Sequence, residues 1–311
     1  MVTGWQRLVR DYLELRRSLG VSLEGPGIML AGFARHQQDA GALHLTTEAA
    51  LAWAVQPEDT EPVWHAMRLS AVRGFSAHLH SLGPLHQVVP DRLLRRNYHR
   101  KPPYLFTSTD VDVLLRAAAG LRPPLYAATF HTLIGLLSVT GMRPGEAIRL
   151  DRADVDLARA LLSVTDTKRK TTRRLPLHPS TVLALRDYVT RRDQLCPLPR
   201  DPAFLLTGAG VRPDLRTLQR TFTRLAARHG IARPPRGPGL KDFRHTLAVT
   251  TLTGWYRSGA DVTARLPLLS AWLGHRSPAS TYWYITASPE LLAAVTEQMA
   301  TARDNTSPEP S

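Results

Sequence analysis

The segment TGMRPGEAIRL, from Thr140 to Leu150, carries the strongest local structural signals in this chain of 311 residues. Gly141 can adopt the left-handed conformation that ends a helix, and Pro144 suits the first turn of the next helix. Arg143 is therefore predicted at a helix start, where free backbone N–H groups favour an anion. Glu146, three residues on, is spaced to hold the guanidinium of Arg143. By itself such a pair is most often a structural salt bridge.

The whole chain is basic, and it has enough apolar residues to build folded domains. Lys and Arg number 40 against 26 Asp and Glu, a net charge of +14, and 43% of the residues are hydrophobic. This charge favours a polyanionic partner, and nucleic acid is the most common one. An acidic membrane surface is a weaker candidate for the partner. The alternative without any partner is a protein from an Arg-rich proteome. The sequence shows no apolar run of about 18 residues. Cys196, the single cysteine, suits a reducing cytoplasm.

Upstream of Thr140, apolar spacing predicts helices. A long apolar helix is expected over 125–140, and Thr107 with Asp110 resembles a capping box at the start of a second domain. Residues 1–96 predict a small helical domain of four helices, the second running over 28–39 after a break at 25–27. Between the domains, 97–106 is a basic stretch in which Pro102 and Pro103 prevent a helix, so we expect a linker. The tail, 301–311, is predicted to be disordered.

Downstream of Leu150, two short strands are predicted over 161–164 and 174–177, around a turn that is crowded with basic residues. A hairpin tip of this kind can enter a DNA groove, and the alternative is a solvated turn. Helices return after Pro179. The fold class is therefore mainly α, with a small β-hairpin in the second of two domains.

Two later segments complete the set of candidate site residues. In LKDFRHTLAVTTL, 240–252, Lys241 and Arg244 are three apart and share one side of a helix. In WLGHRSPASTYWYIT, 272–286, His275 precedes Tyr284 by nine residues. Tyr282 is a second phenol nearby, and a tyrosine at such a place is usually a packing residue.

In this order and at these spacings, the residues resemble the tyrosine recombinase, or phage integrase, family. The resemblance covers nearly the whole chain: the motifs span 143 to 284, the helical domain is similar to the family's core-binding domain, and 107–300 is similar to its catalytic domain. The resemblance implies that Glu146 supports Arg143 and that the catalytic residues are Arg143, Lys168, Lys241, Arg244, His275 and Tyr284.

The resemblance also implies an activity: site-specific cleavage and rejoining of DNA strands through a 3′-phosphotyrosine bond, with no cofactor and no metal. The implied partners are double-stranded DNA carrying a specific core site and further copies of the chain, a tetramer joined by a helix after Tyr284. The predicted DNA contacts lie in the hairpin, at the end of the first domain and in the linker, and comprise Arg169, Lys170, Arg173, Arg95, Arg96, Arg100 and Lys101.

One position departs from the family pattern. Lys241 stands where the family usually has histidine, so it either removes a proton or only binds phosphate; a lysine base needs burial or nearby cations to lose its own proton. Two other functions stay open at this point. One is a DNA-binding protein that kept the fold without the chemistry, and the other is a type IB topoisomerase, which shares the catalytic set.

Overall fold

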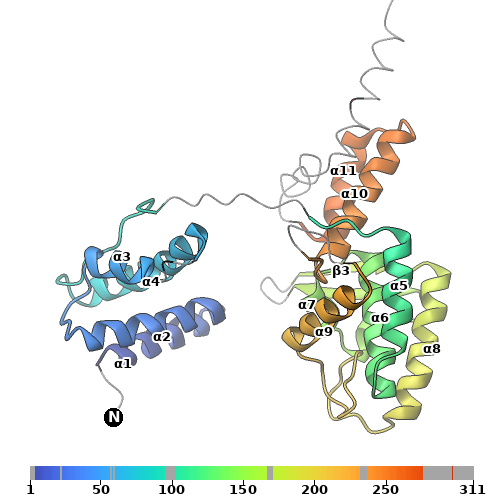
Figure 1. The fold of residues 1–311 in the computed structure, drawn as a ribbon, viewed down its shortest axis with the longest axis horizontal. Coiled ribbons are helices and arrows are strands. Elements are labelled where there is room, and N and C mark those ends of the chain that lie inside the picture. The colour runs from blue at the N-terminus through green and yellow to red at the C-terminus, as the bar shows by residue number, and fades with distance from the viewer. Residues whose placement is uncertain are drawn as a thin grey trace, which may run out of the picture. The chain divides into compact units, whose positions relative to one another are not determined.

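The computed structural model describes residues 4–21, 23–56, 58, 60–94, 103–166, 171–231, 237–275 and 296. The chain forms two compact units, Met1–Lys101 and Pro102–Ser311, coloured from blue to cyan and from green to red in Figure 1. Within the described ranges, no helix combines the length and the apolar character needed to cross a membrane.

The first unit is built from helices around one apolar core. Helices α1 and α2 pack side by side, and α4 packs against both α2 and α3. Trp5, Phe33, Trp53 and Phe75 are buried at the centre of this core. The helices are α1 (Gly4–Ser18), α2 (Glu24–Asp39), α3 (Thr47–Val55) and α4 (Pro62–Leu82).

The predicted break at 25–27 is wrong, because these residues form the first turn of α2. Pro26 is tolerated there since the first N–H groups of a helix have no partner within the helix. Gly27 is buried against α1, and an added Cβ would lie 3.4 Å from Leu13 Cδ1. Gly27 therefore lies at the contact between the two helices.

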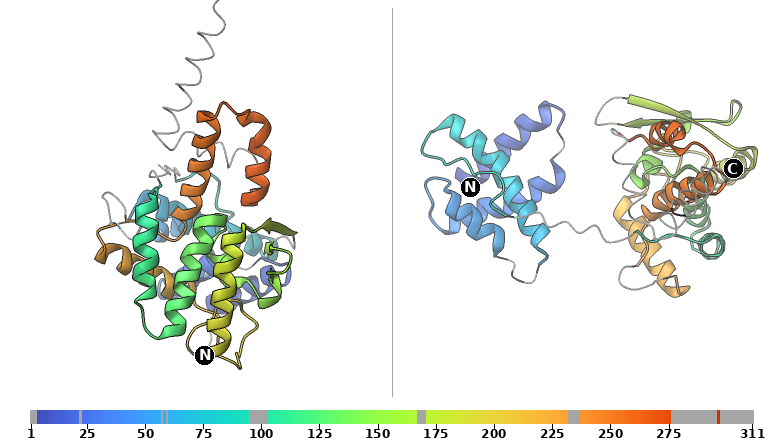
Figure 2. Two further views of the ribbon diagram at one scale, coloured as in Figure 1. Left: turned by 90° about the vertical axis from the view of Figure 1, so that its right-hand side faces the viewer. Right: turned by 90° about the horizontal axis from the view of Figure 1, so that it is seen from above.

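The second unit is mainly helical, with one small sheet. Helix α6 lies between α5 and α8, and the three run alongside one another in Figure 2. Because it is covered on both sides, α6 is apolar over most of its surface, as the sequence predicts. The helices are α5 (Ser108–Ala119), α6 (Pro124–Thr140), α7 (Pro144–Arg149), α8 (Pro179–Leu195), α9 (Leu215–Arg228), α10 (Asp242–Arg257) and α11 (Val262–Leu273), with the 3-10 turn η1 (Arg152–Asp154).

The predicted capping box at the start of α5 is confirmed. The Thr107 N–H donates to Asp110 Oδ2 at 2.9 Å, and the Asp110 N–H donates to Thr107 Oγ1 at 3.1 Å. Directly before it, Phe106 stacks on Phe243 of α10, with ring centroids 4.3 Å apart. The entry to this unit is thus fixed to the helix that carries Arg244.

The sheet is antiparallel with the order β1 (Val155–Asp156), β2 (Leu161–Asp166), β3 (Thr171–Pro176). The predicted hairpin is present, although both strands reach further toward the turn than expected. Leu162 lies opposite Leu175, and Val164 lies opposite Arg173. Residues directly opposite in an antiparallel pair point to the same face. Leu162, Val164 and Leu175 are buried, so Arg173 belongs to the inner face.

Helices α10 and α11 form a hairpin with an apolar seam of its own, which includes Ala248, Leu252, Leu266 and Leu269. The start of α10 belongs instead to the main core through Phe243, which is buried. This arrangement brings the start of α10 and the end of α11 beside the end of α6.

Candidate active site

Arg143 is positioned by the junction between α6 and α7. Gly141 ends α6 with φ of +60°, and Arg143 precedes Pro144, the first residue of α7. Glu146 accepts a hydrogen bond from the Arg143 backbone N–H at 2.8 Å and from Arg143 Nη1 at 2.9 Å. The predicted pairing is confirmed. The Arg143 side chain remains 47% exposed, so the pair orients a cation that still faces solvent.

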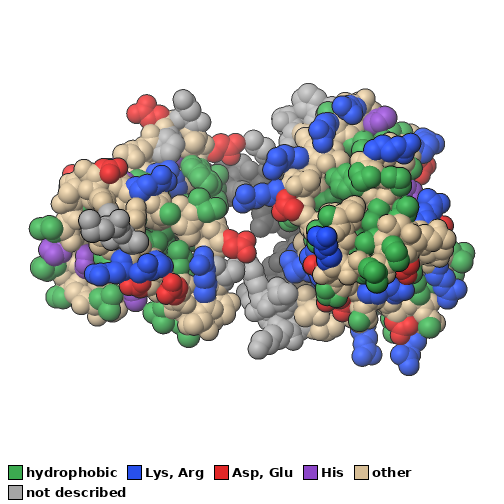
Figure 3. Space-filling model, turned by 90° about the horizontal axis from the view of Figure 1, so that it is seen from below, with side chains coloured by type: hydrophobic (Ala, Val, Ile, Leu, Met, Phe, Trp, Pro, Cys, Tyr) green, Lys and Arg blue, Asp and Glu red, His purple; other side chains and the backbone are tan. Residues whose placement is uncertain are grey.

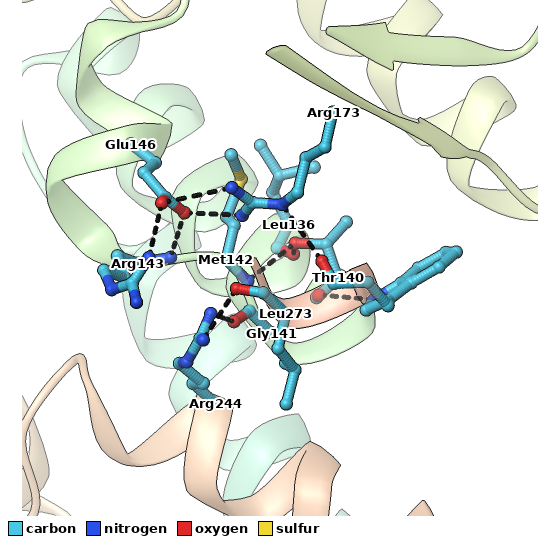
Figure 4. Close-up of polar contacts among 10 residues, drawn as sticks. Leu136, Thr140, Gly141, Met142, Arg143, Glu146, Arg173, Arg244 and Leu273 are labelled. Atoms are coloured by element: carbon cyan, nitrogen blue, oxygen red, sulfur yellow. Dashed lines mark hydrogen bonds and ion pairs between the residues drawn. The ribbon is translucent and has the colours of Figure 1, made fainter. Parts of the chain in front are cut away.

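Arg244 reaches the same junction from α10, where it is buried. Its Nη1 donates to the Gly141 carbonyl at 3.1 Å and its Nη2 donates to the Leu273 carbonyl at 2.7 Å. One guanidinium therefore connects the last carbonyls of two helices. Figure 4 shows Arg143 bound to Glu146 and Arg244 bound to the two carbonyls at this junction, each arginine coming from a different element.

His275 follows directly from the end of α11. Gly274 takes the left-handed conformation with φ of +67°, and the His275 N–H donates to the Ser270 carbonyl at 2.9 Å, the closing bond of a helix C-cap. Burial, and then the positive charges of Arg244, Arg143 and Arg173, lower the pKa of His275 to about 4. The imidazole is therefore neutral at physiological pH.

Glu146 holds a second guanidinium besides that of Arg143. Arg173 Nη2 donates to Oε2 at 2.7 Å and Arg173 Nη1 donates to Oε1 at 3.2 Å. The Glu146 side chain is only 3% exposed. Burial would raise the pKa of Glu146, but the hydrogen bonds from Arg173 and Arg143 and the Arg173 charge outweigh burial and lower it to about 2.

Replacement of Glu146 by glutamine should flatten the acid branch of the stability curve. A carboxyl whose pKa falls from 4.5 to about 2 on folding stabilises the folded state above pH 4.5. That stability is lost as the pH falls from 4.5 toward 2, because the unfolded chain takes up the proton first. The contribution at neutral pH is on the order of 3 kcal/mol.

Urea titrations between pH 7 and pH 3 measure this effect. The wild-type free energy of unfolding should fall faster with acid than that of Glu146→Gln. His275 also weakens the fold of both proteins as the pH drops from 6.5 toward 4, so the two curves are compared below pH 4.5, where Glu146 takes up its proton. Parallel curves would contradict the assigned role of Glu146.

Of the remaining predicted residues, Lys241 and Arg173 lie in the described part of the chain, and the others lie outside it. Lys241 is exposed directly before α10, on the turn where Asp242 Oδ2 accepts from the Gly239 N–H at 2.7 Å. Arg173 was predicted to contact DNA, whereas in the structure its guanidinium binds Glu146 and the Trp272 carbonyl within the protein. The others lie outside the described residues, as do Tyr282 and the helix after Tyr284: Lys168, Arg169, Lys170, Tyr284, Arg95, Arg96, Arg100 and Lys101.

A basic stripe on α9 was not anticipated from the sequence. Arg216, Arg220, Arg224 and Arg228 recur every four residues and are all exposed, while Phe222 on the opposite side is buried. The four-residue spacing of arginines was the available signal. Lys and Arg side chains also cover parts of the second unit in the view of Figure 3, between hydrophobic side chains.

Proteins of known family resemble this chain over most of its length. It is 40% identical over 299 residues to the putative integrase/recombinase y4rB of Sinorhizobium fredii, covering 94% of this chain and 95% of that protein. It is 31% identical over 264 residues to the tyrosine recombinase XerC of a Mycobacterium species, covering 84% of each.

Solved structures share the fold at low sequence identity. The XerH site-specific recombinase bound to a palindromic difH substrate matches with a TM-score of 0.66 and 16% identity, over 87% of this chain and 77% of that one. A lambda integrase tetramer bound to a Holliday junction matches with a TM-score of 0.64 and 15% identity, over 89% and 76%. The model of the phage integrase family matches residues 106–290, and the chain therefore belongs to the phage integrase family of tyrosine recombinases.

Proposed function

We propose that this chain is a site-specific DNA recombinase that cleaves and rejoins strands through a 3′-phosphotyrosine bond to Tyr284. The observation that carries the proposal is the cluster at the α6–α7 junction. The guanidinium groups of Arg143 and Arg173 share the Glu146 carboxylate, and that of Arg244 binds the Gly141 carbonyl at the same junction. The charges of all three arginines act on His275, whose imidazole is neutral. Such an excess of positive charge, fixed before the substrate arrives, suits the phosphorane-like transition state of a phosphodiester.

In the proposed reaction, Tyr284 Oη attacks the scissile phosphorus and the bond from phosphorus to the 5′ oxygen breaks. Arg143 and Arg244 bind the nonbridging oxygens, whose negative charge grows in the transition state. Their charge also stabilises the phenolate of Tyr284, since a phenol with a pKa of about 10 is otherwise a weak nucleophile. Lys168 donates a proton to the leaving 5′ oxygen. Attack by a 5′ hydroxyl on the phosphotyrosine reverses these steps and rejoins the strand.

The structure supports different roles for His275 and Lys241. A neutral imidazole can donate a hydrogen bond through one nitrogen and accept one through the other, so His275 suits binding of the phosphate or of the proton that Tyr284 loses. Lys241 is exposed directly before α10, where its flexible side chain has three donors to offer a phosphate oxygen. We therefore assign Lys241 to phosphate binding.

The proposed partners are a specific DNA site and further copies of this chain. The first unit takes the role of a core-binding domain, and the helix after Tyr284 joins protomers into a tetramer on two DNA sites. Solved relatives with this fold are described as bound to DNA substrate and as a tetramer on a Holliday junction. This assignment places the protein on chromosomal DNA in the cytoplasm.

The arginine stripe on α9 is proposed to contact the DNA backbone. Replacement of Arg220 and Arg224 by glutamine should weaken binding to all sequences alike. Each lost phosphate contact reduces the slope of log K against log salt by about 0.9, so the double variant should lose about 2. Fluorescence anisotropy across a salt series measures the slope. A matched control removes Arg186 and Arg191, which are exposed on α8; equal losses in both variants would argue against a specific role for α9.

Covalent trapping tests the function without a known target site. The protein is expressed in its source cells, the cells are lysed in denaturant, and DNA linked to the protein is recovered and sequenced. We expect the ends to concentrate at a few positions that share a short motif. Footprints at discrete sites without covalent DNA would instead indicate a DNA-binding protein that lacks the chemistry.

A supercoiled plasmid that lacks the recovered motif separates the recombinase from a type IB topoisomerase. A topoisomerase relaxes such a plasmid freely, because it cleaves with little sequence preference. The recombinase should leave it supercoiled and should act only once the motif is inserted. Relaxation of the motif-free plasmid would favour the topoisomerase.

A further inference from the structure

Arg173 lies between the α6–α7 junction and the end of α11, the two segments that carry Arg143 and His275. The sequence predicted only a DNA contact for this residue. It belongs to β3, binds Glu146 of α7 through both terminal nitrogens, and donates from Nε to the Trp272 carbonyl of α11 at 3.0 Å. We propose that Arg173 is a positioning residue, which lets Glu146 orient Arg143 without neutralising it and which fixes the turn that carries His275. This inference rests on the proposed function and deepens it.

The direction of the Arg173 side chain follows from the sheet. Arg173 is the partner of buried Val164 and lies two residues before buried Leu175, so the alternation along β3 turns it inward. Its side chain is 16% exposed, against 47% for Arg143. Arg174, the next residue, falls on the other face and is exposed. Arg173 therefore points toward the interior, and Arg174 points toward solvent from the same strand.

The charge balance explains why a second arginine is needed. Glu146 Oε1 accepts from both Arg143 and Arg173, and Glu146 Oε2 accepts from Arg173 and from the Arg143 backbone. Because Arg143 and Arg173 share one carboxylate, the three side chains together keep a net positive charge, which can attract the phosphate. Without Arg173, a buried carboxylate would have Arg143 as its single cationic partner among these groups, and the attraction of Arg143 for a phosphate would fall.

The contact with α11 links the same residue to His275. Trp272 accepts from Arg173 through its carbonyl and donates from Nε1 to the Thr140 carbonyl at 2.9 Å. At Gly274 an added Cβ would lie 2.8 Å from Arg173 Nη1, and φ is +67°. The backbone conformation favours glycine at this position, and any larger residue would also displace the guanidinium that packs against it. Arg173 and Trp272 together tie the turn before His275 to the turn before Arg143.

A comparison of three variants on two substrates tests the inference. The variants are Arg173→Met, which removes the charge, Arg173→Lys, which keeps it, and Arg174→Met as the matched control. The substrates are the recovered site with its natural phosphate and the same site with a methylphosphonate at the scissile position. A methylphosphonate has lost one nonbridging negative charge, so it depends less on a cation to stabilise the transition state.

On natural phosphate, Arg173→Met should cleave about 100-fold more slowly than wild type in a single turnover. Most of that loss should disappear on methylphosphonate, and Arg173→Lys should recover part of the rate. A purely structural defect would slow both substrates by the same factor, and that result would overturn the inference. It would also be overturned by an equal loss in Arg174→Met or by no recovery in Arg173→Lys.

A second measurement needs neither DNA nor activity. In a titration of the ¹⁵N-histidine-labelled protein, the pKa of His275 should rise above its value of about 4 in Arg173→Met, because one of the cations that lower it is gone. Arg174→Met should leave it unchanged. An unchanged pKa in Arg173→Met would count against the inference. If the wild type failed to cleave, the proposed function would fall, and this titration would still decide whether Arg173 controls the site.

Discussion

Tyr284→Phe should abolish strand cleavage and covalent adduct formation while DNA affinity stays at the wild-type level. The substitution keeps the ring and removes the one oxygen that is proposed to attack phosphorus, so no bond to DNA can form. Cleavage is measured on a nicked oligonucleotide that carries the recovered site, and affinity on the intact duplex. The effect should be the largest of any single substitution, because the other groups accelerate a step that this oxygen performs.

Tyr282→Phe is the matched control, since it removes a phenol two residues away. Its cleavage rate should stay near that of the wild type. Adduct formation that persists in Tyr284→Phe and is lost in Tyr282→Phe would assign the nucleophile to Tyr282. Loss in both variants would point to disturbance of the segment as a whole.

Arg244→Lys should reduce the cleavage rate by about 100-fold to 1,000-fold. Lysine keeps the charge, but a single ammonium cannot reproduce a planar fork that donates to Gly141 and Leu273 at once. The variant should also unfold more readily, by about 1–3 kcal/mol, because a buried carbonyl loses its donor. Single-turnover cleavage and urea unfolding measure the two effects separately.

Arg257→Lys is the control for this change, because Arg257 is exposed in the last turn of the same helix. Both its rate and its free energy of unfolding should match the wild type. A cleavage rate for Arg244→Lys within a few-fold of wild type would show that charge alone suffices. The geometric role of the guanidinium would then be excluded.

Features that depend on a few neighbouring residues could be predicted from the sequence. The end of α6 at Gly141, the Thr107 capping box and the bond from Arg143 to Glu146 all span three or four positions. Helix geometry brings such residues together whatever the rest of the fold does. The first arginine and its carboxylate were therefore accessible without a structure.

Arg173 shows why the rest of the site was not accessible. Its partners are 27 and 99 residues away in the chain, and its direction depends on the strand register. Leu175 two residues later could have suggested an inward side chain, but the basic run around Arg173 favoured a solvated turn or a DNA contact. The start of α2 failed for a related reason. Glycine and proline usually interrupt a helix, but Gly25, Pro26 and Gly27 fall in the first turn of α2, where the N–H group that proline lacks has no partner within the helix.

The central claim is a covalent bond between DNA and one particular tyrosine, and peptide mapping of the trapped adduct tests it most directly. The adduct is digested with nuclease and trypsin, and the peptide that runs from Ser277 to Arg303 is fragmented in a mass spectrometer. We predict that a nucleotide is attached through its 3′ phosphate to Tyr284. A nucleotide on Tyr282 or on any other residue, or DNA joined through a 5′ phosphate, would contradict the account.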